Sequence, residues 1–304
     1  MSSPRGQKRI RHSRSDLIFT VVDYVLLGIG VLVVAYPLVY VLSASFSSSH
    51  AVISGRVFLW PVDPTLDGYQ AVFRNKQVWT GYVNSATYTA LGTTVNLVMT
   101  VLAAYPLSRR DFYGRNLIMG LFAVTMFFSG GLIPGYLLVR ALGMLNTRWA
   151  MVIPGAMSVW NVIVARTYFQ SNIPGELLDA AQIDGCSNSR FLAIIVVPLS
   201  GPILAVLALW CAVGYWNSYF SALIYLKEAR FYPLQIVLRN ILIQNAISSD
   251  MLGHVDIKRV AELEGLRELL KYSLIIVASL PVLLLYPFAQ KYFVRGIMIG
   301  AIKG

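Results

Sequence analysis

Six runs of mostly apolar residues constrain the fold of this chain more than any other feature of its sequence. The runs cover about 18–45, 82–107, 117–138, 150–170, 199–226 and 271–290. A helix of about 20 apolar residues crosses the hydrocarbon core of a bilayer, and it satisfies its own backbone hydrogen bonds where water is absent. The runs therefore predict an all-α membrane protein with six transmembrane helices.

The composition favours a membrane protein and argues against nucleic-acid binding. Of the 304 residues, 57% are hydrophobic and 13% are charged, whereas soluble domains carry about 45–50% and about 25%. The net charge is +11, but a cluster of basic residues lies just before the first run: Arg5, Lys8, Arg9, Arg11 and Arg14. Such a cluster is typical of a cytoplasmic flank. The first run exceeds the roughly 7–15 residues of a signal-peptide core, so we expect it to be retained.

The number of runs sets the topology once the basic tail is placed inside. Six spans bring both termini to the cytoplasmic side. The predicted inner segments are 1–17, 108–116, 171–198 and 291–304. The predicted outer segments are 46–81, 139–149 and 227–270. Within the third run, the Gly-Gly-Leu-Ile-Pro sequence at 130–134 predicts a hinge, because glycine and proline break transmembrane helices.

Several kinds of chemistry have no counterpart in the sequence. No GxxxxGK(S/T), HExxH or GxSxG motif occurs, so neither an ATP-binding P-loop nor a familiar hydrolase site is predicted. The spans hold few ionisable residues, Asp23 and Arg166 near their ends, whereas ion-coupled carriers need such groups inside the membrane. Cys186 and Cys211 form no metal-binding pair. We predict no catalytic residue, no metal site and an energy source outside this chain.

The inner segment 171–198 is more elaborate than a simple connection between spans. Pro174 suits a first helical turn, Glu176 and Asp179 suit the positive end of a helix dipole, and Gly185 suits a left-handed stop. A second short helix, capped by Asn188 or Ser189, is expected before Pro198 turns the chain into the fifth span. The pair of helices is either an interfacial hairpin or a docking surface for a partner.

This segment also carries a motif. It resembles the E-A-A-x-x-x-G-x(9)-I-x-L-P signature of bacterial ABC-importer permeases: Asp179-Ala180-Ala181 begins the match, Gly185 follows at the right spacing, and Ile195 to Pro198 closes it. Asp179 stands where the signature has Glu, and Val197 where it has Leu. The resemblance implies that the segment is a coupling helix that docks on an ATPase. The residues that it assigns to the contact are Glu176, Asp179, Ala180, Ala181, Asp184, Gly185, Ile195 and Pro198.

The likeness extends over most of the chain. "TMFFSGGLIPGYLLV" and "VGYWNSYFSALIYL" are similar to carbohydrate-uptake permeases of the maltose-permease type, and in particular to the branch that includes alginate-type importers. The resemblance implies a type I ABC importer permease fold over 18–290 and a multi-pass location in the bacterial cytoplasmic membrane. It implies a second permease, a pair of ATPase subunits that bind the ATP and Mg, and an extracytoplasmic solute-binding protein. No cofactor is expected on this chain.

Two further sets of residues follow from the resemblance and from the chemistry of sugars. The ending "FVRGIMIGAIKG" is similar to the tail of the smaller maltose-type permease, which implies an ATPase contact at Gly296, Gly300 and Lys303. Aromatic and amide side chains suit a sugar path, and the fourth and fifth spans offer Trp160, Asn161, Trp216, Asn217 and Tyr219. The same aromatic residues could instead form an interfacial belt.

The sequence is compatible with more than one class of substrate. We expect an oligosaccharide, with uronate oligomers among the candidates because the outer segments carry basic residues: Lys227, Arg230, Arg239, Lys258 and Arg259. Those residues could equally pair with neighbouring acids or with the binding protein. The alternatives are an ABC permease for a non-sugar solute and a membrane scaffold with a docking loop.

Overall fold

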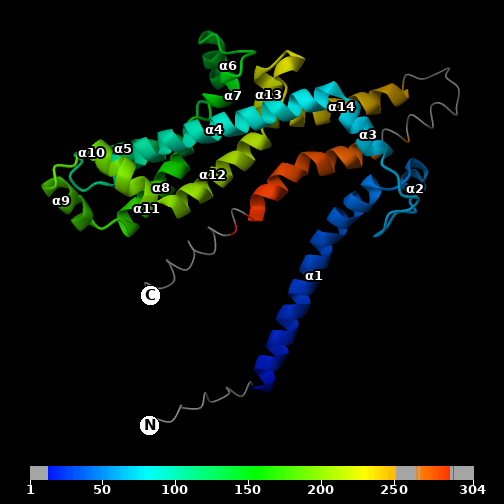
Figure 1. Cartoon of the computed structure of the whole chain (residues 1–304), viewed down its shortest axis with the longest axis horizontal. Helices are drawn as coiled ribbons and strands as arrows, with labels where there is room; N and C mark the ends of the chain where they lie inside the picture. The colour runs from blue at the N-terminus through cyan, green and yellow to red at the C-terminus, as the bar shows by residue number, and fades with distance from the viewer. Residues whose placement is uncertain (1–12, 251–264, 266–267, 288–289, 291–304) are drawn as a thin grey trace. The chain divides into compact units, whose positions relative to one another are not determined.

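The computed structural model of the protein describes residues 13–250, 265, 268–287 and 290 (Figure 1). Every regular element within those residues is helical, so the predicted all-α class is confirmed. The chain divides into two compact units, one formed by residues 1–71 with 254–276 and the other by 72–253 with 277–304. The tail residues Gly296, Gly300 and Lys303 lie outside the described residues, as do Lys258 and Arg259.

The first unit is built on α1 (Arg14–Ser45), a helix whose apolar side chains are exposed along most of its length. Only its last turn is buried, at Ser43, Ala44 and Ser45, against α2 (Ser49–Ile53) and the chain that follows. The Oγ of Ser43 donates to the carbonyl of Leu59 at 2.6 Å. A helix with apolar residues all round is covered by lipid or by another protein, because water would not tolerate it.

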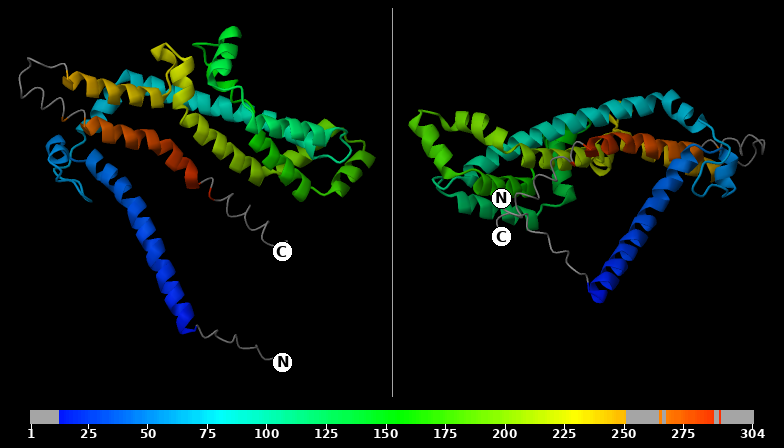
Figure 2. Two further views of the ribbon diagram at one scale, coloured as in Figure 1. Left: turned by 180° about the vertical axis from the view of Figure 1, so that it is seen from behind. Right: turned by 60° about the horizontal axis from the view of Figure 1, so that its bottom comes forward.

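The second unit is centred on α4 (Lys76–Ser108), which packs along α8 (Val159–Asn172) and α12 (Gly201–Trp216). The three helices lie side by side in each view (Figures 1 and 2). Small residues permit the close approach: a Cβ at Gly92 would lie 2.4 Å from the ring of Tyr215 on α12. Close packing through glycine is the usual way in which transmembrane helices associate.

The N-terminal half of α4 forms hydrogen bonds to residues 230–232, which follow the fifth apolar run. Asn84 donates from Nδ2 to the carbonyls of Arg230 and Tyr232, at 2.8 and 3.1 Å. The hydroxyl of Tyr88 donates to the carbonyl of Phe231 at 2.8 Å. These bonds fix the short η2 helix (Ala229–Phe231) and the start of α14 (Leu234–Asp250) against α4.

Several of the apolar runs are broken rather than straight. The third holds α5 (Arg115–Phe127) and α6 (Leu132–Ala141), bent by 111°, and Gly131 has φ +83° at the break. The predicted hinge therefore coincides with the observed bend. In the fourth run, residues 153–158 separate α7 (Trp149–Val152) from α8, because Pro154 cannot supply the N–H that a continuous helix needs. In the fifth run, α12 ends at Trp216 and a separate helix, α13 (Tyr219–Tyr225), follows.

Three helices in the described residues are long and apolar enough to cross a membrane by themselves: α1, α4 and Glu268–Pro287. Two bent pairs meet the same criterion when taken together, α5 with α6 and Asn188–Leu199 with α12. The remaining elements are α3 (Asp67–Arg74), α9 (Gly175–Ile183), α10 (Asn188–Phe191), the π-helical turn η1 (Leu192–Val196) and α11 (Val197–Leu199).

Candidate functional site

The segment with the motif folds into two short helices joined by a tight turn. α9 begins after Pro174, with Glu176 in its first turn, and ends at Ile183, with Asp184 as its C-cap. Gly185 then takes φ +73°, the left-handed conformation that favours glycine. Its N–H donates to the carbonyl of Gln182 and the next N–H, of Cys186, donates to that of Ala181, at 3.0 and 2.8 Å. This pair of bonds is a Schellman motif, which closes the end of α9 as the sequence predicted.

The second helix begins one residue earlier than expected. Ser187, rather than Asn188 or Ser189, is the N-cap of α10, and its hydroxyl accepts from the N–H of Arg190. The displaced cap leaves the Asn188 side chain available for another contact. After α10 the chain passes through η1 and α11, where Pro198 lies near the start, and bends by 80° into α12.

α9 has one face on the protein and one face outward. Ala181 is 6% exposed and packs in a cluster with Phe191, Val196 and residues of α4, α8 and α12. Ile195 is half-buried against the same cluster. The outward face carries Glu176, Asp179, Ala180 and Asp184. Of the two neighbouring alanines in the motif, only Ala180 therefore lies where a partner could reach it.

Sequence reasoning missed one residue on that outward face. Ile183, in the last turn of α9, is 87% exposed, next to the exposed Asp184. Its position four residues after Asp179 puts both on the same side of the helix. An exposed β-branched side chain flanked by carboxylates suits a small apolar pocket with a basic rim. No signal in the sequence marked this residue, because exposed and buried isoleucines look alike in a chain that is 57% hydrophobic.

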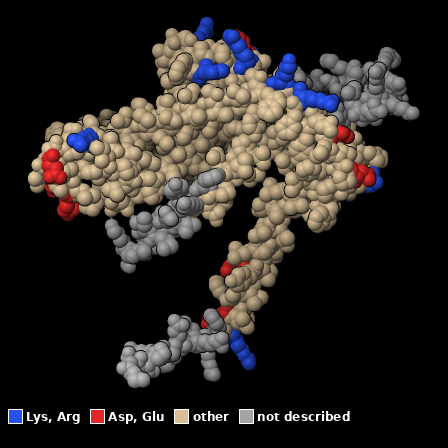
Figure 3. Space-filling model, viewed as in Figure 1, with Lys and Arg blue, Asp and Glu red and all other residues tan. Residues whose placement is uncertain are grey.

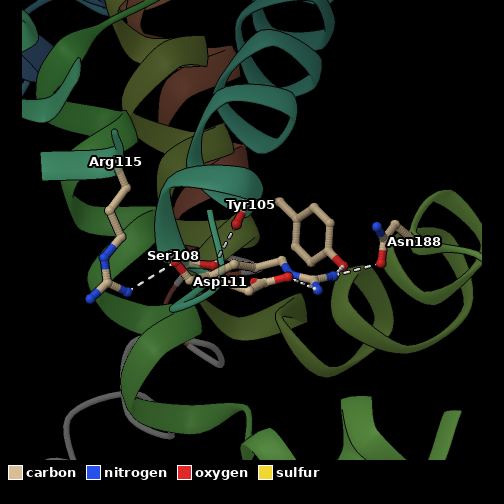
Figure 4. Close-up of polar contacts among 6 residues, drawn as sticks. Tyr105, Ser108, Asp111, Arg115 and Asn188 are labelled. Carbon is tan, nitrogen blue, oxygen red and sulfur yellow. Dashed lines mark hydrogen bonds and ion pairs between the residues drawn. The ribbon is translucent and has the colours of Figure 1, made fainter. Parts of the chain in front are cut away.

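Arg109, the C-cap residue of α4, connects the α9–α10 segment to that helix. Figure 4 labels its partners Tyr105, Asp111 and Asn188. The Arg109 guanidinium donates to both carboxylate oxygens of Asp111, to the hydroxyl of Tyr105 at 3.1 Å and to Oδ1 of Asn188 at 2.6 Å. Its backbone carbonyl accepts from Arg115 at 2.9 Å. The hydrogen bond from Arg109 holds the pKa of Asp111 below its ordinary value, because the bond favours the charged carboxylate.

The residues proposed for a sugar path do not share one environment. Asn161 is 7% exposed, and Trp216 is 6% exposed with its Nε1 donating to the carbonyl of Ala278 at 3.0 Å. Trp160 and Asn217, next to them in the sequence, are exposed, and so is Tyr219. The structure thus separates two buried side chains, those of Asn161 and Trp216, from exposed ones. Among the exposed ones, Asn217 also donates from Nδ2 to the carbonyl of Val213 at 3.0 Å.

Asn161 belongs to a buried polar network. Its Nδ2 donates to Oδ1 of Asn96 on α4, at 3.1 Å, and lies 3.3 Å from the sulfur of Cys211 on α12. Asn96 in turn donates to the carbonyl of Gly155, in the break before α8, at 2.9 Å. The hydroxyl of Tyr215 donates to the same carbonyl at 2.9 Å. The network satisfies a backbone carbonyl that the broken helix would otherwise leave without a partner in the membrane.

A group of basic side chains lies away from α9, toward the N-terminal half of α4. Asn146, with φ +57°, accepts from the N–H groups of Lys227 and Glu228 at 3.0 Å each and so fixes the loop before α7 against the end of α13. Four exposed basic residues belong to this region, and we call them the basic end: Arg140, Arg148, Lys227 and Arg230. Figure 3 shows Lys and Arg side chains over α6 and α13, and Asp and Glu side chains at α9. Arg230 pairs with Glu228 at 2.5 Å.

The described residues contain no group of three His, Cys, Asp or Glu side chains that could hold a metal ion. The arrangement is thus one of surfaces and packed helices: an acidic helix with an apolar tip, a charged joint, a buried amide network and a basic end.

Comparisons with known proteins agree with this architecture. No protein-family model matches the sequence. The chain is 38% identical over 287 residues to the polygalacturonan/rhamnogalacturonan transport system permease protein YtcP of Bacillus subtilis, a match that covers 94% of this chain and 99% of that protein. It is 37% identical over 295 residues to the protein LplC of the same organism, with 97% and 98% covered.

A solved structure gives the same result. One chain in the crystal structure of a bacterial ABC transporter involved in the import of the acidic polysaccharide alginate matches with a TM-score of 0.85 and 36% identity. The match covers 94% of this chain and 100% of that one. Similarity of this extent places the protein among the helical membrane permeases. The chain belongs to the family of permease subunits of ABC sugar transporters.

Proposed function

We propose that this chain is one half of the membrane pathway of an importer for acidic oligosaccharides and that a separate ATPase drives it. The observation that carries the coupling part is the outward face of α9, where carboxylates flank the exposed Ile183. The membrane sequence has no P-loop of its own, so ATP and Mg would bind on the partner. A second permease would complete the pathway, and the exposed apolar length of α1 is one surface that it could cover.

The orientation that fits this role places both termini and the α9–α10 segment in the cytoplasm and the basic end outside. Basic residues are normally enriched on the cytoplasmic side of short loops. Between 217 and 240, Glu228 is the single acidic residue, and between 130 and 160 there is none. A basic outer surface departs from this cytoplasmic enrichment of basic residues. An acidic ligand or an acidic binding protein would explain the departure.

The substrate class is supported by two independent observations. The relatives concern polygalacturonan/rhamnogalacturonan and the acidic polysaccharide alginate, and galacturonan is itself built from an acidic sugar. The basic end supplies the complementary charge, which raises the local concentration of anions and steers their association. The exposed Trp160, Asn217 and Tyr219 would offer stacking and hydrogen bonding farther along the path.

Uptake by the reconstituted transporter tests the proposal. Proteoliposomes that hold this chain, its second permease and the ATPase are given the solute-binding protein with galacturonate oligomers, alginate oligomers or neutral galactose oligomers of the same length. We expect ATP-dependent uptake of at least one acidic oligomer and little of the neutral one. Liposomes with this chain alone should take up neither. Equal uptake of the neutral oligomer, or uptake without the ATPase, would contradict the proposal.

A further inference from the structure

We propose that Arg109 is the positioning residue that transmits movement of the docking segment to α4. The inference rests on the proposed docking of α9 on an ATPase, and it assigns to this joint a role that the motif does not contain. Arg109 lies outside the motif at the end of α4, and the bond to Asn188 connects residues 79 positions apart. Figure 4 labels Tyr105, Asp111 and Asn188, the residues whose side chains accept from the Arg109 guanidinium.

The geometry suits a joint because the guanidinium is held from several sides. Its four hydrogen bonds use four of the five N–H groups that arginine offers. The side chain is 10% exposed, whereas that of Asp111 is 64% exposed. A planar fork held at this many points has little freedom to rotate, and lysine cannot reproduce the arrangement. A displacement of Asn188 is therefore passed to the end of α4 rather than absorbed by the side chain.

Apolar packing beside the joint acts in the same place. Phe191 on α10 is 3% exposed, and its ring centre lies 6.5 Å from that of Tyr105 on α4. Tyr105 also lies under the Arg109 guanidinium, 5.8 Å from its centre. The Phe191 contact keeps α10 near α4, and the Arg109 hydrogen bond to Asn188 fixes the position of α10 along α4. Loss of Arg109 should therefore loosen the joint without releasing the loop from the membrane helices.

A direct neighbour offers a matched control. Arg110 has the same charge and side chain, and it is exposed, with no side-chain hydrogen bond or ion pair within the part of the chain that the structure describes. If charge near the membrane surface were the important property, Arg109→Gln and Arg110→Gln would have equal effects. If the joint is important, only the first should matter.

The test uses the complete transporter in proteoliposomes, with three readouts: ATPase retained on purification, ATP hydrolysed, and substrate taken up per ATP. The unaltered complex is purified first, because failure of the ATPase to co-purify would refute the docking itself rather than the role of Arg109. We then expect Arg109→Gln and Asn188→Ala to retain the ATPase and its basal hydrolysis but to lower uptake per ATP about tenfold, the size expected for a hydrogen bond to a charged group. Arg109→Lys should recover part of this loss, and Arg110→Gln should match the unaltered protein.

The double variant Arg109→Gln/Asn188→Ala separates a joint from general damage. Two residues of one contact are not additive, so the double variant should be no worse than the more impaired single variant. The proposal would be overturned by normal uptake per ATP in Arg109→Gln, by an equal loss in Arg110→Gln, by additive losses in the double variant, or by a loss that merely follows the amount of assembled complex.

Discussion

The left-handed turn at Gly185 leads to a prediction that separates the effect of side-chain size from the cost of a positive φ angle. A side chain built at Gly185 would meet no heavy atom within 4 Å, so the free protein has room for one. The backbone there has φ +73°, which alanine adopts at a cost and asparagine adopts more readily. The pair Gly185→Ala and Gly185→Asn therefore varies the conformational cost while keeping the added group small.

The size of the effect follows from these two facts. The left-handed conformation costs an L-residue about 1–2 kcal/mol, and no steric clash adds to it. If the turn relaxes in the free protein, docking on the ATPase must restore it at this cost. An energy of about 1–2 kcal/mol corresponds to a factor of about 5–30 in an equilibrium constant. We expect Gly185→Ala to weaken ATPase binding by this factor, and Gly185→Asn by about threefold or less.

Binding is measured by titrating the purified ATPase against the permease pair in lipid nanodiscs. Gly185→Arg is included as a bulky variant, and it should bind worst because it combines the strained turn with obstruction of the partner. The reasoning fails if Gly185→Asn is as impaired as Gly185→Ala or more so, since size and not φ would then decide. It also fails if Gly185→Arg binds the ATPase normally, because the turn would then lie away from the contact.

Two further predictions concern packing. Ile183→Ala should weaken ATPase binding by roughly tenfold or more, since each buried CH₂ contributes about 0.8 kcal/mol. The thermal midpoint of the purified chain should stay constant, because this residue is 87% exposed. A lowered midpoint with normal binding would contradict the assignment of Ile183 to the docking face. Gly92→Ala should destabilise the chain by about 1–3 kcal/mol, because its Cβ would lie 2.4 Å from the Tyr215 ring. Gly120→Ala, where nothing lies within 4 Å, is the control in the same thermal unfolding measurement.

The parts of the fold that depend on local chemistry could be predicted from the sequence. The end of α9 follows from Gly185 and the bend in the third run follows from Gly131, because in each case the residue itself permits the unusual backbone angle. Helix existence followed from apolar length. The break at 153–158 was missed because a proline in an apolar run is compatible with a kinked but continuous helix.

The parts that depend on distant residues could not be predicted. Nothing local distinguishes Ala180 from Ala181, and only packing against α4, α8 and α12 buries the second. Asn161 next to Trp160 looked like a sugar ligand, but its partner is Asn96 on another helix. Ile183 was hidden by the composition itself, because an exposed isoleucine cannot be recognised in a chain that is 57% hydrophobic.

The buried amide network has a mechanical consequence. The helix α4, to which Asn96 of this network belongs, has 33 residues and is roughly 50 Å long at 1.5 Å per residue. Asn96 fastens this rod near its middle, Arg109 stands at one end, and Asn84 and Tyr88 grip the η2 segment toward the other. A stiff rod with a central fulcrum reverses motion: a tilt of about 5° carries each end about 2 Å, in opposite directions. A pull on the Arg109 end would thus push the η2 segment the other way, with the amides as the pivot.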